Sequence, residues 1–305
     1  MSTSLRVGSH HIALTHPDKL MYPGDGITKE DVVDYYRSVA EPFLRHAKGR
    51  PLTLQRFPDG IEREGFYQKQ ASESLPDWMP RVRVPLADGS SQVQLSADEE
   101  AAVVFLVQQG TIAFHTWGSR RGDLQRPDWI VFDLDPPSGE DFALARDAAL
   151  ELRGMLEDVG LTSFVMVTGS TGIHLRVPIR TGPKFDEARA FARSVVDALA
   201  RAHPDTMTTE VRKKKRRGRL FLDVARNALG QTAIAPYSLR PRDGAPVAAP
   251  LDWDELGRIA SADRYTMSSL LRRMAQRDDP WKGMGRSAAD LTRAAKAWSE
   301  SRNAR

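Results

Sequence analysis

Cysteine is absent from the 305 residues of this sequence. Disulfides and thiolate metal sites are therefore excluded, and the absence fits a protein of the reducing cytoplasm. No apolar run approaches the roughly 20 residues that span a bilayer. Residues 1–11 also lack the apolar core of a signal peptide. We therefore expect a cytoplasmic protein that makes no use of a membrane.

The composition is that of a globular protein with a basic bias. Hydrophobic residues make up 41% and charged residues 28% of the chain, and its length suffices for one large domain or two small ones. The net charge is only +4, but the sequence pI is about 9.4 and the positive charge is partly clustered. This clustering points to an anionic partner.

Two carboxylates stand at the end of a short apolar run. Residues 129–132 are β-branched or aromatic, which predicts a buried strand. Asp133 and Asp135 follow two positions apart, so their side chains point to the same face. Paired carboxylates repel each other unless a cation lies between them, and their oxygens suit Mg²⁺ or Mn²⁺. Taken alone, the pattern favours the alternative, a solvated pair that opens a turn.

Residues 126–240 alternate strands and helices in the order β-α-β-β-α-β. This is the split βαβ or ferredoxin-like unit, whose right-handed crossovers place both helices on one face of the sheet. In this topology the first and third strands are central neighbours, and the fourth strand lies beside the first. The predicted strands are 129–135, 163–168, 173–179 and 220–224, and the predicted helices are 141–159 and 185–200.

The predicted topology gathers distant polar residues on the helix-free face of the sheet. Asp223 approaches Asp133 and Asp135 from one side, although it lies far away in sequence. His174 and Arg176 occupy the same face on the other side. Three carboxylates that hold two divalent ions are what phosphoryl transfer needs. The combined cluster therefore predicts a metal site.

Three further segments are suited to an anionic or nucleic-acid ligand, each with a plainer alternative. The turn 169–172 (GSTG) offers backbone N–H groups to phosphate, but it lacks the lysine and helix of a P-loop. The adjacent aromatics Phe66 and Tyr67 form either a stacking surface for bases or a core-and-edge pair. The run 212–219 (RKKKRRGR) either contacts a DNA backbone or forms a solvated hairpin tip.

The remaining elements follow from capping boxes and apolar patterns. Residues 291–298 are expected to form a loose helix, after which the last residues fray. The predicted elements outside the core are a helix to about 47 opened by Thr28 and Asp31, a helix to about 109 opened by Ser96 and Glu99, and strands 51–57 and 112–116.

Three segments resemble the motifs of archaeo-eukaryotic primases: 132–136 (FDLDP), 168–175 (TGSTGIHL) and 221–223 (FLD). The likeness is greatest to the polymerase domain of bacterial DNA ligase D, which works in end joining. It covers residues 8–280, with matching segments at 15–23, 66–70, 232–240 and 247–256. No ligase or nuclease module accompanies them, so the chain resembles a stand-alone primase-polymerase. Such proteins fill short gaps and often prefer ribonucleotides with Mn²⁺.

The resemblance implies roles for individual residues. Two Mn²⁺ or Mg²⁺ ions would be held by Asp133, Asp135 and Asp223, with His115 and His174 at the same active site. The incoming NTP or dNTP would contact Thr168, Ser170, Thr171, Arg216 and Arg240. DNA would contact His16, Lys19, Lys29, Phe66, Tyr67, Lys213, Lys214 and Lys215. In this scheme Lys19 and Lys29 hold a 5′-phosphate across a gap, and the aromatic pair packs against the DNA.

The sequence departs from the family pattern at the expected triphosphate site. Gln55 and Thr171 stand where several members use lysine, which puts nucleotide affinity in doubt but not the metal chemistry. Arg56, Arg176 or Arg226 would compensate for the missing charges. His16 stands where some members have asparagine.

We expect a mixed α/β (α+β) fold of the primase type, with a ferredoxin- or RRM-like catalytic core and a packed N-terminal module. Residues 1–290 would form one catalytic domain, divided into a module 1–125, the core 126–240 and a portion 241–290, followed by a tail 291–305. Expected partners are gapped or primer–template DNA with a 5′-phosphate, a DNA ligase and Ku. We expect a monomer in the bacterial nucleoid.

Two other functions are alternatives to this prediction. A non-catalytic, single-strand-binding module on an RRM-like sheet would carry aromatics on the open face, where this chain has carboxylates. A nucleotide cyclase uses a similar strand order and two metals, but it needs neither the basic run nor a DNA-stacking pair. The sequence favours the polymerase.

Overall fold

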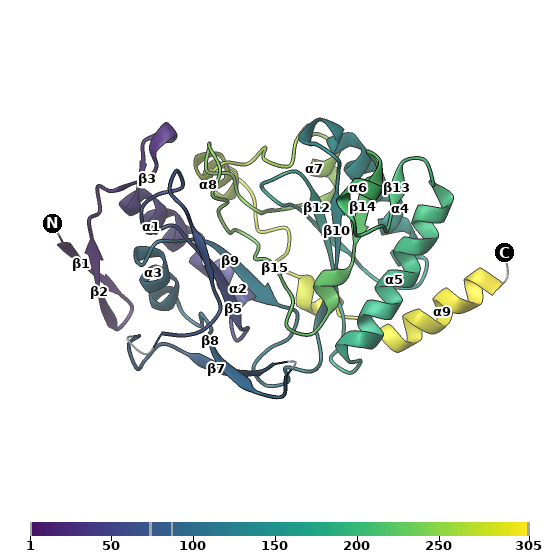
Figure 1. Cartoon of the computed structure of the whole chain (residues 1–305), viewed down its shortest axis with the longest axis horizontal. Coiled ribbons are helices and arrows are strands. Elements are labelled where there is room, and N and C mark those ends of the chain that lie inside the picture. Colours follow the sequence, from purple (N-terminus) through teal and green to yellow (C-terminus); the bar gives the residue numbers. More distant parts are fainter. Residues whose placement is uncertain (1, 73–74, 87, 304–305) are drawn as a thin grey trace. The chain divides into compact units, whose positions relative to one another are not determined.

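The computed structural model describes residues 2–72, 75–86 and 88–303. The chain forms two compact units that interleave along the sequence. The first unit comprises residues 1–122, 232–249 and 265–278, and the second comprises 123–231, 250–264 and 279–305. Figure 1 labels most of the helices and many of the strands of both units. The predicted division of one catalytic domain into three consecutive portions stays a prediction.

The first unit is built around a four-stranded antiparallel sheet in the order β15-β9-β5-β6. The α-helices of this unit are α1 (Lys29–Ser38), α2 (Ala40–Ala47), α3 (Glu100–Gln108) and α8 (Met267–Met274). The sheet strands are β5 (Leu52–Arg56), β6 (Phe66–Gln68), β9 (Thr111–Trp117) and β15 (Thr232–Ile234). Three two-stranded ribbons are β1 (Ser2–Val7) with β2 (His10–Thr15), β3 (Leu20–Tyr22) with β4 (Ile27–Thr28), and β7 (Arg81–Pro85) with β8 (Ser91–Leu95).

One of the two predicted capping boxes is confirmed in this unit. The Thr28 hydroxyl accepts a bond from the Asp31 N–H, and the Asp31 carboxylate accepts one from the Thr28 N–H. The predicted single helix to residue 47 is interrupted at Val39, where α1 ends and α2 begins. The second box was wrong: α3 begins only at Glu100, because the Ser96 hydroxyl donates to Asp98 and does not cap the helix.

The second unit contains a six-stranded sheet in the order β13-β14-β10-β12-β11-β16. Its four central strands have the predicted ferredoxin order, with the fourth strand beside the first. The elements are β10 (Trp129–Asp135), α4 (Phe142–Glu157), β11 (Phe164–Val167), β12 (Ile173–Pro178), α5 (Phe185–Ala202), β13 (Met207–Thr208), α6 (Lys213–Arg216), β14 (Leu220–Asp223), β16 (Ala249–Leu251), α7 (Trp253–Leu256) and α9 (Leu291–Asn303). Short 3₁₀ turns lie at Pro23–Asp25 in the first unit and at Gly139–Asp141, Ala225–Asn227 and Met284–Ser287 in the second.

Strands and helices of this unit are joined by an apolar core. On α5 the residues Phe185, Ala188, Phe191, Val195 and Leu199 are all buried, as expected for the apolar face of a helix. On α4 the buried residues are Phe142, Ala145, Ala148, Ala149, Leu152 and Leu156. Both helices contact the central strand β10, and α4 also contacts β12.

Two predictions for this unit need correction. The basic run does not form a hairpin tip, because the preceding strand β13 pairs with β14 in parallel, and residues 213–216 form the helical turn α6. The chain also remains helical through Asn303, well past the loose helix expected to end at 298. In the part of the chain that the structure describes, no helix is long and apolar enough to cross a membrane.

Candidate active site

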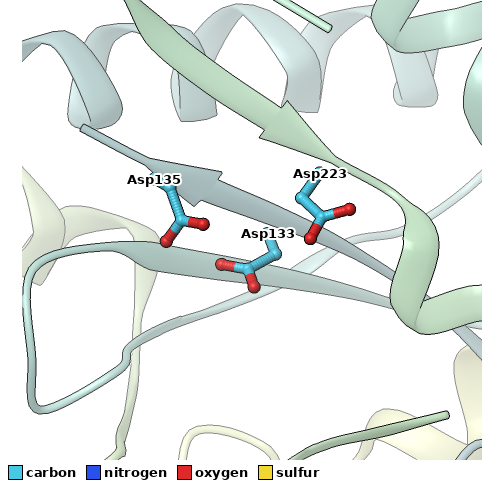
Figure 2. Close-up of side chains that lie close together, drawn as sticks. All are labelled: Asp133, Asp135 and Asp223. Atoms are coloured by element: carbon cyan, nitrogen blue, oxygen red, sulfur yellow. The ribbon is translucent and has the colours of Figure 1, made fainter. Parts of the chain in front are cut away.

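The three acidic residues meet because of strand register. Asp133 on β10 lies directly opposite Asp223 on β14, and Asp135 stands two positions further along β10. Directly opposed residues of antiparallel strands point to the same face of the sheet. One carboxylate oxygen from each of the three residues lies within 4.8 Å of the others. Figure 2 shows the three carboxylates projecting toward one another from the two strands.

The crowding of these carboxylates disfavours their ionised form. Burial raises the pKa of Asp135 to about 7, and repulsion from Asp133 and Asp223 adds to the shift. Burial also raises the pKa of Asp223, against a hydrogen bond from the Ala225 N–H that lowers it. Hard oxygen donors that repel one another are the ligand set of a divalent cation such as Mg²⁺ or Mn²⁺. The site therefore fits the predicted metal.

Positive groups and one histidine surround the triad within the second unit. The His174 Nε2 atom lies 3.1 Å from Asp133 Oδ1, and both side chains are buried. The Arg226 Nε atom lies 3.8 Å from Asp133 Oδ2. Arg216 and Arg226 both lower the pKa of Asp135, although less than burial raises it. The predicted meeting of His174 with the carboxylates is thus present.

Arg176 shares this face of the sheet but is not available to a ligand. It lies opposite Val131 and is only 1% exposed. Its guanidinium lies 4.4 Å from the ring centre of Trp129 and 5.7 Å from that of Trp281. These cation–π contacts give Arg176 a packing role. The expectation that it compensates for a missing lysine is therefore wrong.

The turn between β11 and β12 packs against the end of β10. The Thr168 hydroxyl and N–H both donate to the Gly172 carbonyl, which closes the turn. A Cβ atom on Gly172 would lie 2.5 Å from the Leu134 carbonyl oxygen and 3.3 Å from Asp135 Oδ1. Only glycine allows so close an approach. The half-buried Ser170 and Thr171 are thereby held in the turn beside the triad.

A cavity of about 350 Å³ lies next to Asp223, and sequence reasoning missed it. Arg189 and Arg193 of α5 line it together with Val211 and Phe221. Their spacing of four residues places both arginines on one helix face. That spacing was the available signal, but only the fold shows that this face borders Asp223.

Within the first unit, Gln55, Arg56, Phe66, Tyr67 and His115 lie on the four-stranded sheet. Gln55 lies opposite Tyr67, and His115 lies opposite Thr53, so Gln55, Tyr67 and His115 share one face. The rings of Tyr67 and His115 are 6.0 Å apart. Phe66 and Tyr67 are 47% and 62% exposed, which excludes the core-and-edge alternative. Arg56 is tied to Gln109 and Gln68 by hydrogen bonds.

The predicted phosphate-binding lysines also come together in the first unit. The Lys29 N–H donates to the Lys19 carbonyl, and the Lys29 ammonium donates to the Thr15 carbonyl. Burial and the nearby Lys19 charge lower the pKa of Lys29. Lys19 forms an ion pair of 2.6 Å with Asp59, a partner that no sequence pattern predicted. His16 adopts the left-handed conformation (φ 51°) in the same turn. Arg240 is half-buried elsewhere in this unit.

The basic run contains two kinds of side chain. Lys213, Lys214 and Lys215 are exposed on α6. Arg216 instead donates to the carbonyls of Glu210 and Val211, and its guanidinium lies 3.7 Å from the ring centre of Phe221. The lysines are therefore free to meet solvent or phosphates, while Arg216 is directed toward the acidic strand.

Comparison with known proteins identifies the family. A family model described as "LigD, primase-polymerase domain" matches residues 28–281. The chain belongs to the LigD primase-polymerase domain family. The chain is similar to a multifunctional non-homologous end joining protein LigD of Mycolicibacterium smegmatis, at 37% identity over 80% of this chain and 32% of the relative. It is also similar to a bifunctional LigD of Bacillus subtilis, at 32% identity over 92% of this chain and 45% of the relative.

A solved structure supports the same assignment. The polymerase domain of Mycobacterium tuberculosis ligase D, in complex with DNA, is 33% identical to this chain with a TM-score of 0.85, covering 90% of this chain and 98% of that one. The mixed α/β fold and the primase-polymerase resemblance predicted from sequence are thus confirmed. The LigD primase-polymerase domain is a nucleotidyltransferase. The chain spans about a third to under half the length of the curated relatives it matches.

Proposed function

We propose that this LigD-type domain adds nucleotides to a primer 3′-OH at short gaps during DNA end joining. The observation that carries the proposal is the meeting of Asp133, Asp135 and Asp223 on paired strands of a chain that belongs to a polymerase family. We propose that these carboxylates bind two divalent ions, Mn²⁺ or Mg²⁺. When bound, such ions activate the attacking hydroxyl and neutralise charge on the triphosphate.

The side chains around the triad would orient the incoming nucleotide. His174 contacts Asp133 and would hold that carboxylate in one orientation. Arg226 and Arg216 bring positive charge to the same place and would neutralise phosphate oxygens. Ser170 and Thr171 offer hydroxyls from the turn that Thr168 closes. We propose that these groups fix the triphosphate for in-line attack.

The first unit would bind nucleic acid and nucleotide through surfaces of its own. We propose that Lys19 and Lys29, with His16 in the same turn, hold the 5′-phosphate of the downstream strand. Two close ammonium groups are stabilised by a dianion, which relieves their repulsion. Phe66 and Tyr67 would pack against bases or sugars. Gln55 and Arg240 are proposed as nucleotide-contacting residues of this unit, and His115 as a catalytic residue.

Further partners follow from the family context. The solved M. tuberculosis relative is a complex with DNA, and we propose gapped or primer–template DNA as the substrate here. The exposed Lys213, Lys214 and Lys215 would contact its backbone. A DNA ligase and Ku are proposed as functional partners, ribonucleotides as preferred substrates, a monomer as the active form, and the bacterial nucleoid as the location. A non-catalytic RNA- or DNA-binding role is not favoured, because the sheet face carries carboxylates.

Primer extension on gapped DNA tests the proposed function. Purified protein should add one or a few nucleotides when Mn²⁺ or Mg²⁺ is supplied, and a 5′-phosphate on the downstream strand should increase the yield. Parallel reactions with ribonucleotides and deoxyribonucleotides would measure sugar preference. The variant D223N is the matched control, since it removes one ligand charge with little change in size. Extension by D223N at the wild-type rate, or none by wild type with either metal, would reject the proposal.

A further inference from the structure

The strand that carries the third metal ligand ends at that ligand. The antiparallel register of β14 against β10 pairs Asp223 with Asp133. Continued by two residues, this register would set the main chain of Ala225 against Val131. The chain instead turns after Asp223 and forms a 3₁₀ turn over Ala225–Asn227. The main-chain groups of Val131 would therefore lose their neighbouring strand on this side.

The side chain of Asn227 takes the place of the missing strand. Its Oδ1 atom accepts a bond of 2.7 Å from the Val131 N–H, and its Nδ2 atom donates a bond of 2.7 Å to the Val131 carbonyl. The same Nδ2 atom donates to the Val224 carbonyl at 3.0 Å. Asn227 is only 3% exposed, so water does not compete for these groups. One carboxamide thus ties the turn after β14 to the middle of β10.

The turn that Asn227 holds carries two charged groups of the site. Asp223 begins the turn, and its Oδ1 atom accepts a bond of 2.7 Å from the Ala225 N–H. Arg226 follows, with its Nε atom 3.8 Å from Asp133 Oδ2. Both groups therefore lie within four residues of an anchor that is bonded to β10. Their distances from Asp133 depend on the path of this short turn.

We infer that Asn227 is a positioning residue that sets where Asp223 and Arg226 stand relative to the carboxylates of β10. The inference rests on the proposed metal site. A carboxamide is the side chain suited to this task, because it offers one acceptor and two donors in a plane, as a peptide group does. Groups that orient metal ligands in this way usually change metal affinity or activity about 10- to 100-fold when removed.

The test uses two variants of the full chain and a matched control. N227A removes all three hydrogen bonds. N227S is the milder change, because serine keeps one hydrogen-bonding group at this position. Its shorter side chain still cannot bridge both main-chain groups of Val131. The control L152A truncates a buried side chain of α4 and leaves a cavity there. It therefore destabilises the same unit without changing the turn. Thermal unfolding then shows which variants have lost comparable stability.

Two readouts separate positioning from general stability. Mn²⁺ affinity is measured directly by the loss of the free-ion electron paramagnetic resonance signal, at a temperature at which all variants are folded. Primer extension gives kcat and the nucleotide KM. We expect N227A to bind Mn²⁺ about 10- to 100-fold more weakly and to lower kcat more than it changes KM. L152A should leave both values near wild type, and N227S should fall between.

The outcomes distinguish this inference from the proposed function. If wild type binds no Mn²⁺, or if D135N binds Mn²⁺ as well as wild type does, the metal site itself is rejected. If wild type binds Mn²⁺ and N227A binds it equally well, the site stands and the positioning role is rejected. An equal loss in L152A at matched stability would also reject it, as would failure of both N227A and N227S to fold, since Asn227 would then serve folding alone.

Discussion

Each unit of this protein contains a cluster of like charges: carboxylates in the second unit and lysines in the first. In the second unit, burial and neighbouring carboxylates raise the pKa of Asp135 to about 7. In the first unit, burial and the neighbouring Lys19 lower the pKa of Lys29. Each cluster disfavours its own ionised form and is stabilised by a ligand of opposite charge. The acids thereby suit a cation and the lysines a phosphate.

The two clusters differ in what holds them in place. The carboxylates stand on adjacent strands in fixed register, with a glycine turn packed against their base. Lys19 and Lys29 stand at a turn and a helix N-terminus, and the exposed Asp59 already pairs with Lys19. Chemistry needs its groups fixed within fractions of an ångström, whereas phosphate binding tolerates a mobile point charge. Perturbing the first cluster should therefore abolish turnover, and perturbing the second should weaken binding.

The largest expected effect belongs to the carboxylates. Alanine in place of Asp133, Asp135 or Asp223 should each lower primer extension by about a thousandfold or more, because the three act as one unit. DNA affinity, measured by gel shift, should stay near wild type. The replacements F66A and Y67A should show the opposite pattern, with weaker DNA binding and a nearly unchanged kcat. Near-normal extension by any triad variant would remove that residue from the site.

The pH dependence of metal binding should follow the raised pKa of Asp135. Below about pH 7 the metal must displace a proton, so Mn²⁺ affinity should fall about tenfold per pH unit. In D135N this slope should flatten. Without metal, the free energy of unfolding should change with pH in the opposite direction to metal affinity. The pKa of Asp135 rises from 3.8 in the unfolded chain to about 7 in the folded protein, so the folded protein loses stability as pH rises through this window. Calorimetry and thermal unfolding across pH 4–8 measure both trends.

The close approach of the glycine turn predicts a smaller but definite loss. G172A places a methyl group against the Leu134 carbonyl and the Asp135 carboxylate, so β10 or the turn must shift. We expect kcat to fall about tenfold or more and the free energy of unfolding to fall by about 1–3 kcal/mol. G154A is the matched control, because nothing lies within 4 Å of its new methyl group in α4, and alanine there should stabilise the helix by about 0.5–1 kcal/mol. Equal kinetics for G172A and wild type would disprove the tight approach.

The lysine cluster should control recognition of the downstream strand and leave chemistry intact. Replacing Lys19 and Lys29 with alanine should erase the preference for a 5′-phosphorylated gap. Each replacement should lower the affinity for the phosphorylated gap about tenfold. D59N should strengthen that preference, because Asp59 competes for Lys19. Gel shifts with phosphorylated and unphosphorylated gaps give the ratio. An affinity ratio that is the same in wild type and the double variant would assign both lysines to ordinary surface.

The smallest effect at saturating DNA is expected for the exposed lysines of α6. Neutralising Lys213, Lys214 and Lys215 should flatten the plot of log affinity against log salt by up to about 2–3 units, at roughly 0.9 per lost duplex contact. Turnover at saturating DNA should change little. R216A should instead lower turnover, since its guanidinium stacks on Phe221 and interacts with Asp135. An unchanged salt slope would leave the lysines as solvated surface.

The central sheet could be predicted because its information is local. Alternating apolar residues, turn residues and the rule for right-handed crossovers suffice to order β10, β11, β12 and β14. Strand alternation then requires Asp133 and Asp135 to share a face, and the topology requires Asp223 to stand beside them. The Thr28 capping box is local in the same way. Each of these predictions rests on spacing along the chain and a fixed strand or helix period.

Tertiary structure alone decided the contacts between residues far apart in sequence. Arg176 follows the same alternation as His174, yet Trp129 and Trp281 enclose it, and no local pattern tells which charge will be covered. Asn227 resembles any turn asparagine until β10 places Val131 within its reach, 96 residues earlier in the chain. Asp59 meets Lys19 only because a loop returns across 40 residues. Spacing determines which way a side chain points, but only the packed fold determines what it meets.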